Sequence, residues 1–137
     1  MVADKDVFEK RLLKLEHVLR KLKVFSKIPL EKYLKDEGIQ DRAERNLQIA
    51  AQVCIYIGSH VITEKGYRSP YSYADIFKVL EEEGCLPEDL ANTMQQIAGF
   101  RNILVHEYLE VDNKIVYECL QKTEDFKKFA AHVLTWI

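Results

Sequence analysis

Apolar residues recur at alternating steps of three and four along most of the chain, which is the spacing of amphipathic α-helices. The first such run covers residues 5–25 and carries lysine and arginine on its outer face; Ser26 and Pro29 are expected to end it. A short helix is expected over residues 30–37, with Gly38 as its stop. The pattern therefore predicts two helices in the first quarter of the chain.

A second long helix is predicted from a cap at Asp41 to about Lys65, closed by Gly66. Its apolar residues form two rows on different faces, so this helix belongs at the centre of a bundle or at a subunit interface. Small residues, Gly58 among them, would allow another helix to approach closely. The two rows are Ala43, Leu47, Ala50, Cys54, Ile57 and Val61, and Ile49, Val53 and Tyr56.

The second half of the chain continues the helical pattern after a loop over residues 67–73 that is rich in aromatic and turn residues. Ser72 and Asp75 resemble a capping box and open a short helix that Gly84 ends. Pro87 opens the next helix, and one last helix is expected from residue 112 or 113 to 137. The sum is an all-α protein, a bundle of four or five helices in one domain over residues 1–137.

Composition excludes several classes of protein. Hydrophobic residues make up 47% and charged residues 31%, which is typical of a globular chain. The formal net charge of −2 means that any nucleic-acid site must be a local basic patch. The three cysteines show no C-x-x-C spacing and are expected to be reduced thiols in a cytoplasmic protein. The charged N-terminal segment is no secretory signal, and no apolar run reaches the ~20 residues of a membrane helix.

One stretch, residues 99–112, concentrates polar chemistry inside an apolar run. It places Arg101, His106 and Tyr108 within eight residues, between side chains that are apolar enough for a core. An arginine can bind the non-bridging oxygens of a phosphate, and a histidine exchanges protons near neutral pH. RNA carries its own nucleophile, the 2′-OH, so these residue types suit RNA cleavage without a metal or other cofactor.

Helical geometry leaves two arrangements of these side chains open. Arg101 lies about 40° from Ile97, inside the apolar stripe, whereas His106 lies about 140° from Arg101 on a regular helix. Either the helix ends near His106, or Arg101 and His106 of two subunits meet across a two-fold axis. A structural alternative also remains, in which Arg101 pairs with Glu107 or Glu110 and His106 is a surface residue.

Four segments resemble the HEPN superfamily, and more closely its HepT toxin branch. They are A-E-R-N-L-Q-I-A from Ala43, S-H-V-I from Ser59, Y-A-D-I-F-K-V-L from Tyr73 and G-F-R-N-I-L-V-H-E-Y from Gly99. The last contains the superfamily signature of Arg, four residues, His, one residue and Tyr. The resemblance extends over nearly the whole chain, and nothing in the signature departs from the pattern.

The resemblance implies a two-fold helical homodimer and metal-independent cleavage of RNA by the toxin of a toxin–antitoxin pair. Arg101 and His106 would be the catalytic pair and Asn102 a supporting residue. Tyr108 would be the tyrosine that an MNT-type nucleotidyltransferase antitoxin modifies with AMP. The alternative is a non-catalytic protein that presents nucleotide or substrate to a nucleotidyltransferase partner; it shares the fold but needs no proton transfer.

Other candidates have simpler structural interpretations. His60 and Glu64 lie at i and i+4 but lack a third metal ligand nearby, so a surface pair is favoured and no metal is expected. Arg45 is interpreted as a structural residue that could instead line a dimer cleft. The loop around Arg68 combines a base with tyrosines that could stack on RNA, although packing against the bundle is favoured. The lysines of residues 10–23 are interpreted as a solvated helix face.

Overall fold

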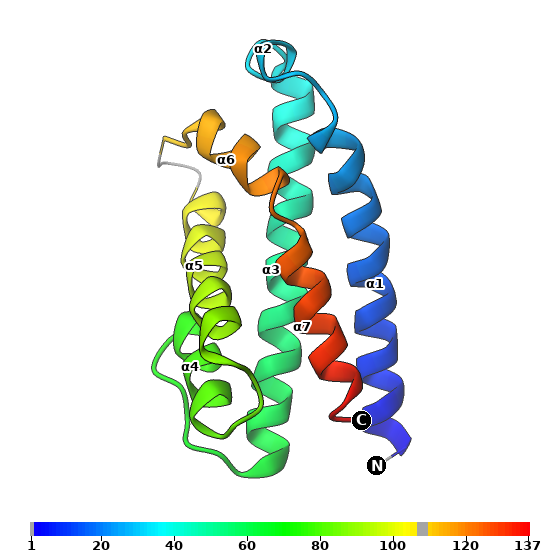
Figure 1. Ribbon diagram of the computed structural model, residues 1–137, viewed down its shortest axis with the longest axis vertical. Coiled ribbons are helices and arrows are strands. Elements are labelled where there is room, and N and C mark those ends of the chain that lie inside the picture. Colours follow the sequence, from blue (N-terminus) through cyan, green and yellow to red (C-terminus); the bar gives the residue numbers. More distant parts are fainter. Residues whose placement is uncertain (1, 107–109) are drawn as a thin grey trace.

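Helix α3 (Glu37–Lys65) is the axis around which the other helices pack in the computed structural model, which describes residues 2–106 and 110–137. Figure 1 shows α1 (Val2–Ser26) on one side of α3 and α5 (Glu88–Val105) with α4 (Tyr73–Glu82) on the other. Helices α6 (Asn113–Leu120) and α7 (Glu124–Leu134) cross the remaining face, and the short α2 (Leu30–Tyr33) follows α1. The described residues form seven helices and no strand, which confirms the all-α class.

The central position of α3 follows from its two apolar rows. The first row is buried along its whole length, with exposed fractions of 4% or less. The second row is covered less evenly: Val53 is buried, Ile49 is half-buried and Tyr56 is 38% exposed. Gly58 lets α4 approach, because a Cβ there would lie 2.6 Å from Cγ2 of Ile76. The structure therefore confirms α3 as a central helix and leaves one strip of it open to solvent.

Two helix boundaries differ from the sequence prediction. Helix α3 begins at Glu37, because the Asp36 carboxylate accepts a hydrogen bond from the Ile39 amide at 3.0 Å. This cap places Gly38 inside the helix, so neither Gly38 as a stop nor Asp41 as the cap was right. The expected last helix is also wrong as a single element, because residues 121–123 separate α6 from α7.

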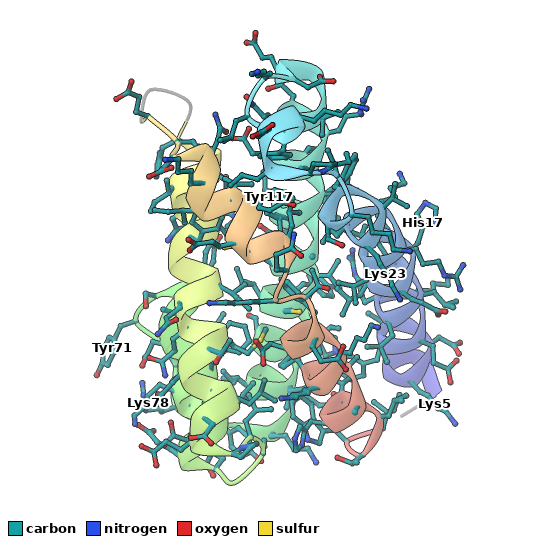
Figure 2. All side chains as sticks on the ribbon, turned by 45° about the horizontal axis from the view of Figure 1, so that its top comes forward. Lys5, His17, Lys23, Tyr71, Lys78 and Tyr117 are labelled. Atoms are coloured by element: carbon teal, nitrogen blue, oxygen red, sulfur yellow. The ribbon has the colours of Figure 1, made fainter. Side chains whose placement is uncertain are left out.

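The break after α6 is stabilised by contacts with the end of α1. The Tyr117 hydroxyl donates to the Ile28 carbonyl at 2.6 Å, and the Gln121 side chain donates to the Ser26 carbonyl at 3.0 Å. These bonds hold α6 across the top of the bundle, where Figure 2 labels Tyr117. Helix α7 then changes direction and buries Phe126, Phe129 and Val133 in the core.

Several predicted helix ends agree with the structure. Ser72 accepts a hydrogen bond from the Asp75 amide at 3.1 Å, as the capping pattern indicates. Gly66 and Gly84 have φ values of 70° and 75°, where a side chain would be strained. Helix α5 ends at Val105, and its C-cap His106 has extended backbone angles of φ −85° and ψ 90°. The chain thus leaves the helical path within the stretch that carries the candidate chemistry.

No described helix is both long and apolar enough to cross a membrane. The three cysteines are free thiols, with Cys54 buried and Cys85 and Cys119 half-buried. Burial raises the pKa of the Cys54 thiol well above its ordinary value, so this side chain acts as part of the core.

Candidate active site

Arg101 occupies the last turns of α5 and is held by groups without charge. Its Nη1 donates a hydrogen bond to the Asn102 side-chain oxygen at 3.1 Å. Its guanidinium carbon lies 5.2 Å from the centre of the Tyr73 ring, which projects from the start of α4. Its Nε is buried and has no hydrogen-bond partner among the described residues.

The charge of Arg101 is uncompensated within residues 2–106 and 110–137, because no carboxylate there makes an ion pair or hydrogen bond with it. The sequence alternative in which Glu110 is its partner is therefore wrong, and Glu107 lies outside the described residues. A partly buried cation without a counter-ion is unfavourable, and binding of an anion removes that cost.

A cavity of about 250 Å³ opens beside Arg101 between α5, α6 and α7. Helix α5 lines it with Gln96, Phe100 and Leu104, as well as with Arg101 itself. Across the cavity lie the last turn of α6 and the start of α7, with one lysine, Lys122, in the connection between them. The cavity combines mainly apolar walls with the guanidinium of Arg101, the ammonium of Lys122 and the carboxylate of Asp125, which makes no ion pair with Arg101 among the described residues.

His106 lies at the exposed C-cap of α5, and its amide donates to the Asn102 carbonyl at 3.3 Å. Among the described residues, the polar contacts of Arg101 are to Asn102 and Tyr73, and none is to His106. The described contacts of one subunit therefore do not join the predicted catalytic pair directly, although α5 ends where the first geometric alternative requires. Asn102, the predicted supporting residue, contacts both partners: its side chain binds Arg101 and its carbonyl binds His106.

The prediction for Tyr108 falls outside the described residues, which resume at Glu110.

Sequence reasoning missed the contact between Tyr73 and Arg101. Tyr73 is 44% exposed and comes from a different helix, so no periodicity within α5 could indicate it. The sequence signal is the enrichment of tyrosine in the loop before α4, which by composition alone favours packing of the loop against the bundle. The structure thus divides that loop between two roles, since Tyr73 faces the site and Tyr71 is 90% exposed and points into solvent (Figure 2).

Arg68 is the basic residue of the same loop, and its guanidinium is engaged in ion pairs within the protein. It donates to the Asp75 carboxylate at 2.7 Å and to the Glu82 carboxylate at 2.9 Å. The hydrogen bonds from Arg68, with that from the Tyr71 amide, hold the pKa of Asp75 below its ordinary value. This network holds the loop against α4. Because two carboxylates already compensate the charge of Arg68, its guanidinium is not available to bind RNA.

The predicted pair of His60 and Glu64 also has a structural role. His60 lies 3.8 Å from Glu64 and packs edge-on against Phe8, with ring centres 5.1 Å apart. Within the part of the chain that the structure describes, no three His, Cys, Asp or Glu side chains are grouped to hold a metal ion.

The fold and the site together define a small helical-bundle protein with a guanidinium that lacks a carboxylate partner among the described residues, beside a cavity near the end of α5. A family model described as "Ribonuclease HepT-like" matches residues 15–133, and the chain belongs to this family. The class and the family agree, because ribonucleases bind phosphodiesters.

Curated relatives and a solved structure extend this result. The chain is 32% identical to the mRNA nuclease HepT of Shewanella oneidensis over 98 residues, which are 71% of this chain and 74% of that protein. It is 32% identical to the tRNA nuclease HepT of Aphanizomenon flos-aquae over 111 residues, 81% of this chain and 76% of that protein. The tri-AMPylated HEPN toxin of Shewanella oneidensis, solved in complex with its MNT antitoxin, has the same fold, with a TM-score of 0.87 at 24% identity over 95% of this chain and 98% of that one.

Proposed function

We propose that this protein is a metal-independent endoribonuclease, the toxin of a toxin–antitoxin pair, and that Arg101 and His106 cleave its RNA substrate. The observation that carries the assignment is the uncompensated guanidinium of Arg101 beside a cavity. Membership of the ribonuclease HepT-like family supports it, as do the two curated relatives that are nucleases of mRNA and tRNA.

The proposed reaction uses the ribose as its own nucleophile. His106 accepts the proton of the 2′-OH, and the 2′-oxygen attacks the adjacent phosphorus while the bond to the 5′-oxygen breaks. The leaving 5′-oxygen takes a proton from water, so the products are a 2′,3′-cyclic phosphate and a 5′-OH. Arg101 binds the non-bridging oxygens and offsets their growing negative charge. Asn102 holds the guanidinium at 3.1 Å and thereby orients it.

A two-fold homodimer completes the proposed site. Within one chain, Arg101 is half-buried beside Tyr73 while His106 stands exposed at the helix end. A second subunit related by a two-fold axis would place its own α5 end opposite, so that each scissile phosphate meets an arginine and a histidine in one cleft. The exposed position of His106 supports this arrangement, because the imidazole is accessible to a second subunit.

Tyr108 is the proposed control point. It follows His106 by two residues, so AMP attached to it by an MNT-type nucleotidyltransferase antitoxin would place a phosphate and an adenosine beside the catalytic pair. The adduct's phosphate would occupy Arg101 and its bulk would block the cleft. The structural relative that is AMPylated and bound to an MNT antitoxin supports this form of control.

The test is cleavage of RNA by the purified protein in EDTA, followed by mapping of the product ends. Wild-type protein should release 2′,3′-cyclic phosphate and 5′-OH ends. His106→Ala should lose activity by about 10²–10⁴-fold, the usual contribution of a general base, while its circular dichroism and size remain those of wild type. The matched control is His17→Ala, because His17 is an exposed histidine on α1, on the opposite side of α3 from α5 (Figure 2).

Two results would count against the proposal in different ways. Cleavage by His106→Ala at the wild-type rate would remove His106 from the mechanism. Nucleotide binding without any cleavage by wild-type protein would favour the non-catalytic partner of a nucleotidyltransferase.

A further inference from the structure

A second cavity, on the opposite face of α3 from the Arg101 cavity, is lined by three cations. Its volume is about 210 Å³, and its basic residues are Arg11 and Lys14 from α1 and Arg45 from α3. Two glutamines, Gln48 and Gln52, complete its polar lining. All three cations are exposed to solvent, and no carboxylate of residues 5–106 or 110–137 lines the cavity.

The cations of this cavity lack counter-ions. Among residues 5–106 and 110–137, neither Arg11, Lys14 nor Arg45 makes an ion pair. Other arginines of the chain do: Arg20 pairs with Glu16 on the same helix, and Arg68 pairs with two carboxylates. On a chain whose net charge is −2, three unpaired cations around one cavity make a local electropositive site.

One of these cations is held in a defined orientation. The guanidinium carbon of Arg11 lies 3.9 Å from the centre of the Tyr56 ring, a close stacking distance. Tyr56 therefore fixes the plane of Arg11 without neutralising its charge. The site is thus more than a chance group of mobile lysines, because one guanidinium is positioned before any ligand arrives.

The basic cavity is separate from the cavity beside Arg101. Leu47 lines the Arg101 cavity, whereas Ile49, two residues further along α3, lines the basic one. Residues two positions apart point about 160° away from each other on a helix, and the helix with its side chains is about 10 Å across. A ligand that reaches both cavities must therefore extend around α3 or across a subunit boundary.

We propose that this cavity, which we call the basic cavity, binds a backbone phosphate of the RNA substrate at a position away from the bond that is cut. Arg and Lys side chains donate to phosphate oxygens, and glutamines donate to phosphate or ribose oxygens, without reading the base. The site supplies affinity for long RNA and no chemistry. The inference rests on the proposed ribonuclease function, since it concerns the substrate of that activity.

The first experiment measures the salt dependence of RNA binding. A fluorescent single-stranded RNA is titrated with the His106→Ala protein at several salt concentrations, with and without the further changes Lys14→Gln and Arg45→Gln. Loss of the one phosphate held in this cavity should lower the slope of log affinity against log salt by about 0.7. Lys65→Gln with Lys128→Gln is the matched control, because it removes the same charge at exposed positions that do not line the cavity.

The second experiment separates the basic cavity from the catalytic site. In otherwise wild-type protein, Lys14→Gln with Arg45→Gln should lower kcat/KM for a long RNA about tenfold, because a phosphate contact is lost. A factor of ten corresponds to about 1.4 kcal/mol of binding free energy. The same pair should leave the cleavage of a very short oligonucleotide unchanged. KM should carry the loss, since the site touches no reacting atom.

Each outcome is decisive. An unchanged salt slope would overturn the inference and leave an acidic protein partner as the occupant of the cavity. An equal decrease of the slope in the Lys65/Lys128 control would also overturn it, because overall charge would then explain the effect. Failure of wild-type protein to cleave any RNA would instead contradict the proposed function, while the slope would still report whether RNA binds here.

Discussion

Arg68 and Arg101 each lie beside an exposed tyrosine, yet their electrostatic surroundings are opposite. Arg68 is bound by the carboxylates of Asp75 and Glu82, and its guanidinium lies 5.6 Å from the Tyr71 ring. Arg101 is bound by an amide oxygen and lies 5.2 Å from the Tyr73 ring, with no carboxylate partner among the described residues. Both contacts depend on α4 or on the loop that leads into it.

The difference lies in what each arginine can still bind. Two carboxylates satisfy the donors of Arg68 and cancel its charge, so its contribution is to hold the loop in place. Neutral partners orient Arg101 but leave its charge available to an anion. Under the proposed function, the charge of the partner groups, more than burial or a nearby aromatic ring, separates the structural Arg68 from the catalytic Arg101.

The largest expected effect comes from removing each arginine in turn. Arg101→Gln should lower RNA cleavage by about 10²–10³-fold, the usual loss when a donor to transition-state charge is removed. Its unfolding temperature should stay close to that of wild type, because Arg101 has no ion pair to lose among the described residues. Arg68→Gln should show the reverse, with nearly normal cleavage per folded molecule and a lower unfolding temperature. The measurements are initial rates and thermal unfolding of both variants.

Similar losses of activity in the two variants would break the comparison. The loop would then act on the chemistry itself, and the carboxylates around Arg68 would have to be part of the site.

The next effect tests α4 as the common support of both regions. A Cβ at Gly58 would lie 2.6 Å from Ile76 Cγ2, so Gly58→Ala should push α4 away from α3. A Cβ at Gly99 meets nothing within 4 Å, so Gly99→Ala is the matched control in another helix. Both changes gain about 1 kcal/mol of helix propensity, but overpacking should make Gly58→Ala about 1–2 kcal/mol less stable than wild type. Denaturant unfolding measures the difference.

A stable Gly58→Ala variant with full activity would show that α4 can move without disturbing either arginine. In that case the comparison between the two regions would not depend on their shared helix.

The helices and their buried faces were predictable because burial follows local periodicity. The core row of α3 and the cap at Ser72 were both predicted and are both observed. The break between α6 and α7 also has a signal in the sequence. The apolar residues Leu120 and Phe126 are six positions apart, whereas the apolar stripe of a continuous helix has steps of three and four. The start of α3 was harder, because Asp36 and Asp41 are equally good caps by residue type.

The candidate site was predictable only in part. Helical geometry placed Arg101 on the apolar side of α5, where it lines a cavity. Its neighbours could not be predicted, because Tyr73 comes from another helix and the absence of a carboxylate is a property of the tertiary structure. The basic cavity was missed for the same reason, since Arg45 alone gave no sign that Arg11 and Lys14 of α1 lie across from it.

A smaller effect is expected from the ring beside Arg101. Tyr73→Leu removes the aromatic face, so kcat should fall about three- to fivefold, which is the size of an exposed cation–π contact. Tyr73→Phe keeps the face and should retain activity, and Tyr71→Leu is the control at the neighbouring exposed tyrosine. Single-turnover cleavage rates measure the effect. Equal losses for Leu and Phe would mean that the Tyr73 hydroxyl, and not the ring, matters.

The smallest effect concerns the stability of the Arg68 region and depends on pH. Hydrogen bonds from Arg68 and from the Tyr71 amide lower the pKa of Asp75 in the folded protein. A carboxyl whose pKa is lower in the folded state stabilises the fold above its unfolded pKa of about 3.9, and this contribution is lost as the pH falls through the folded value. Asp75→Asn should therefore unfold about 1–4 °C below wild type at pH 7.

The difference between Asp75→Asn and wild type should begin to shrink as the pH falls below about 4 and should vanish only below the lowered folded pKa, where Asp75 is neutral in both states. Thermal unfolding at a series of pH values measures it, with Asp125→Asn as a control in a carboxyl of α7 that makes no ion pair among the described residues. RNA cleavage at neutral pH should be unaffected by Asp75→Asn. A constant difference at every pH would show that Asp75 acts as a neutral hydrogen-bond acceptor and would remove charge compensation as the distinction between Arg68 and Arg101.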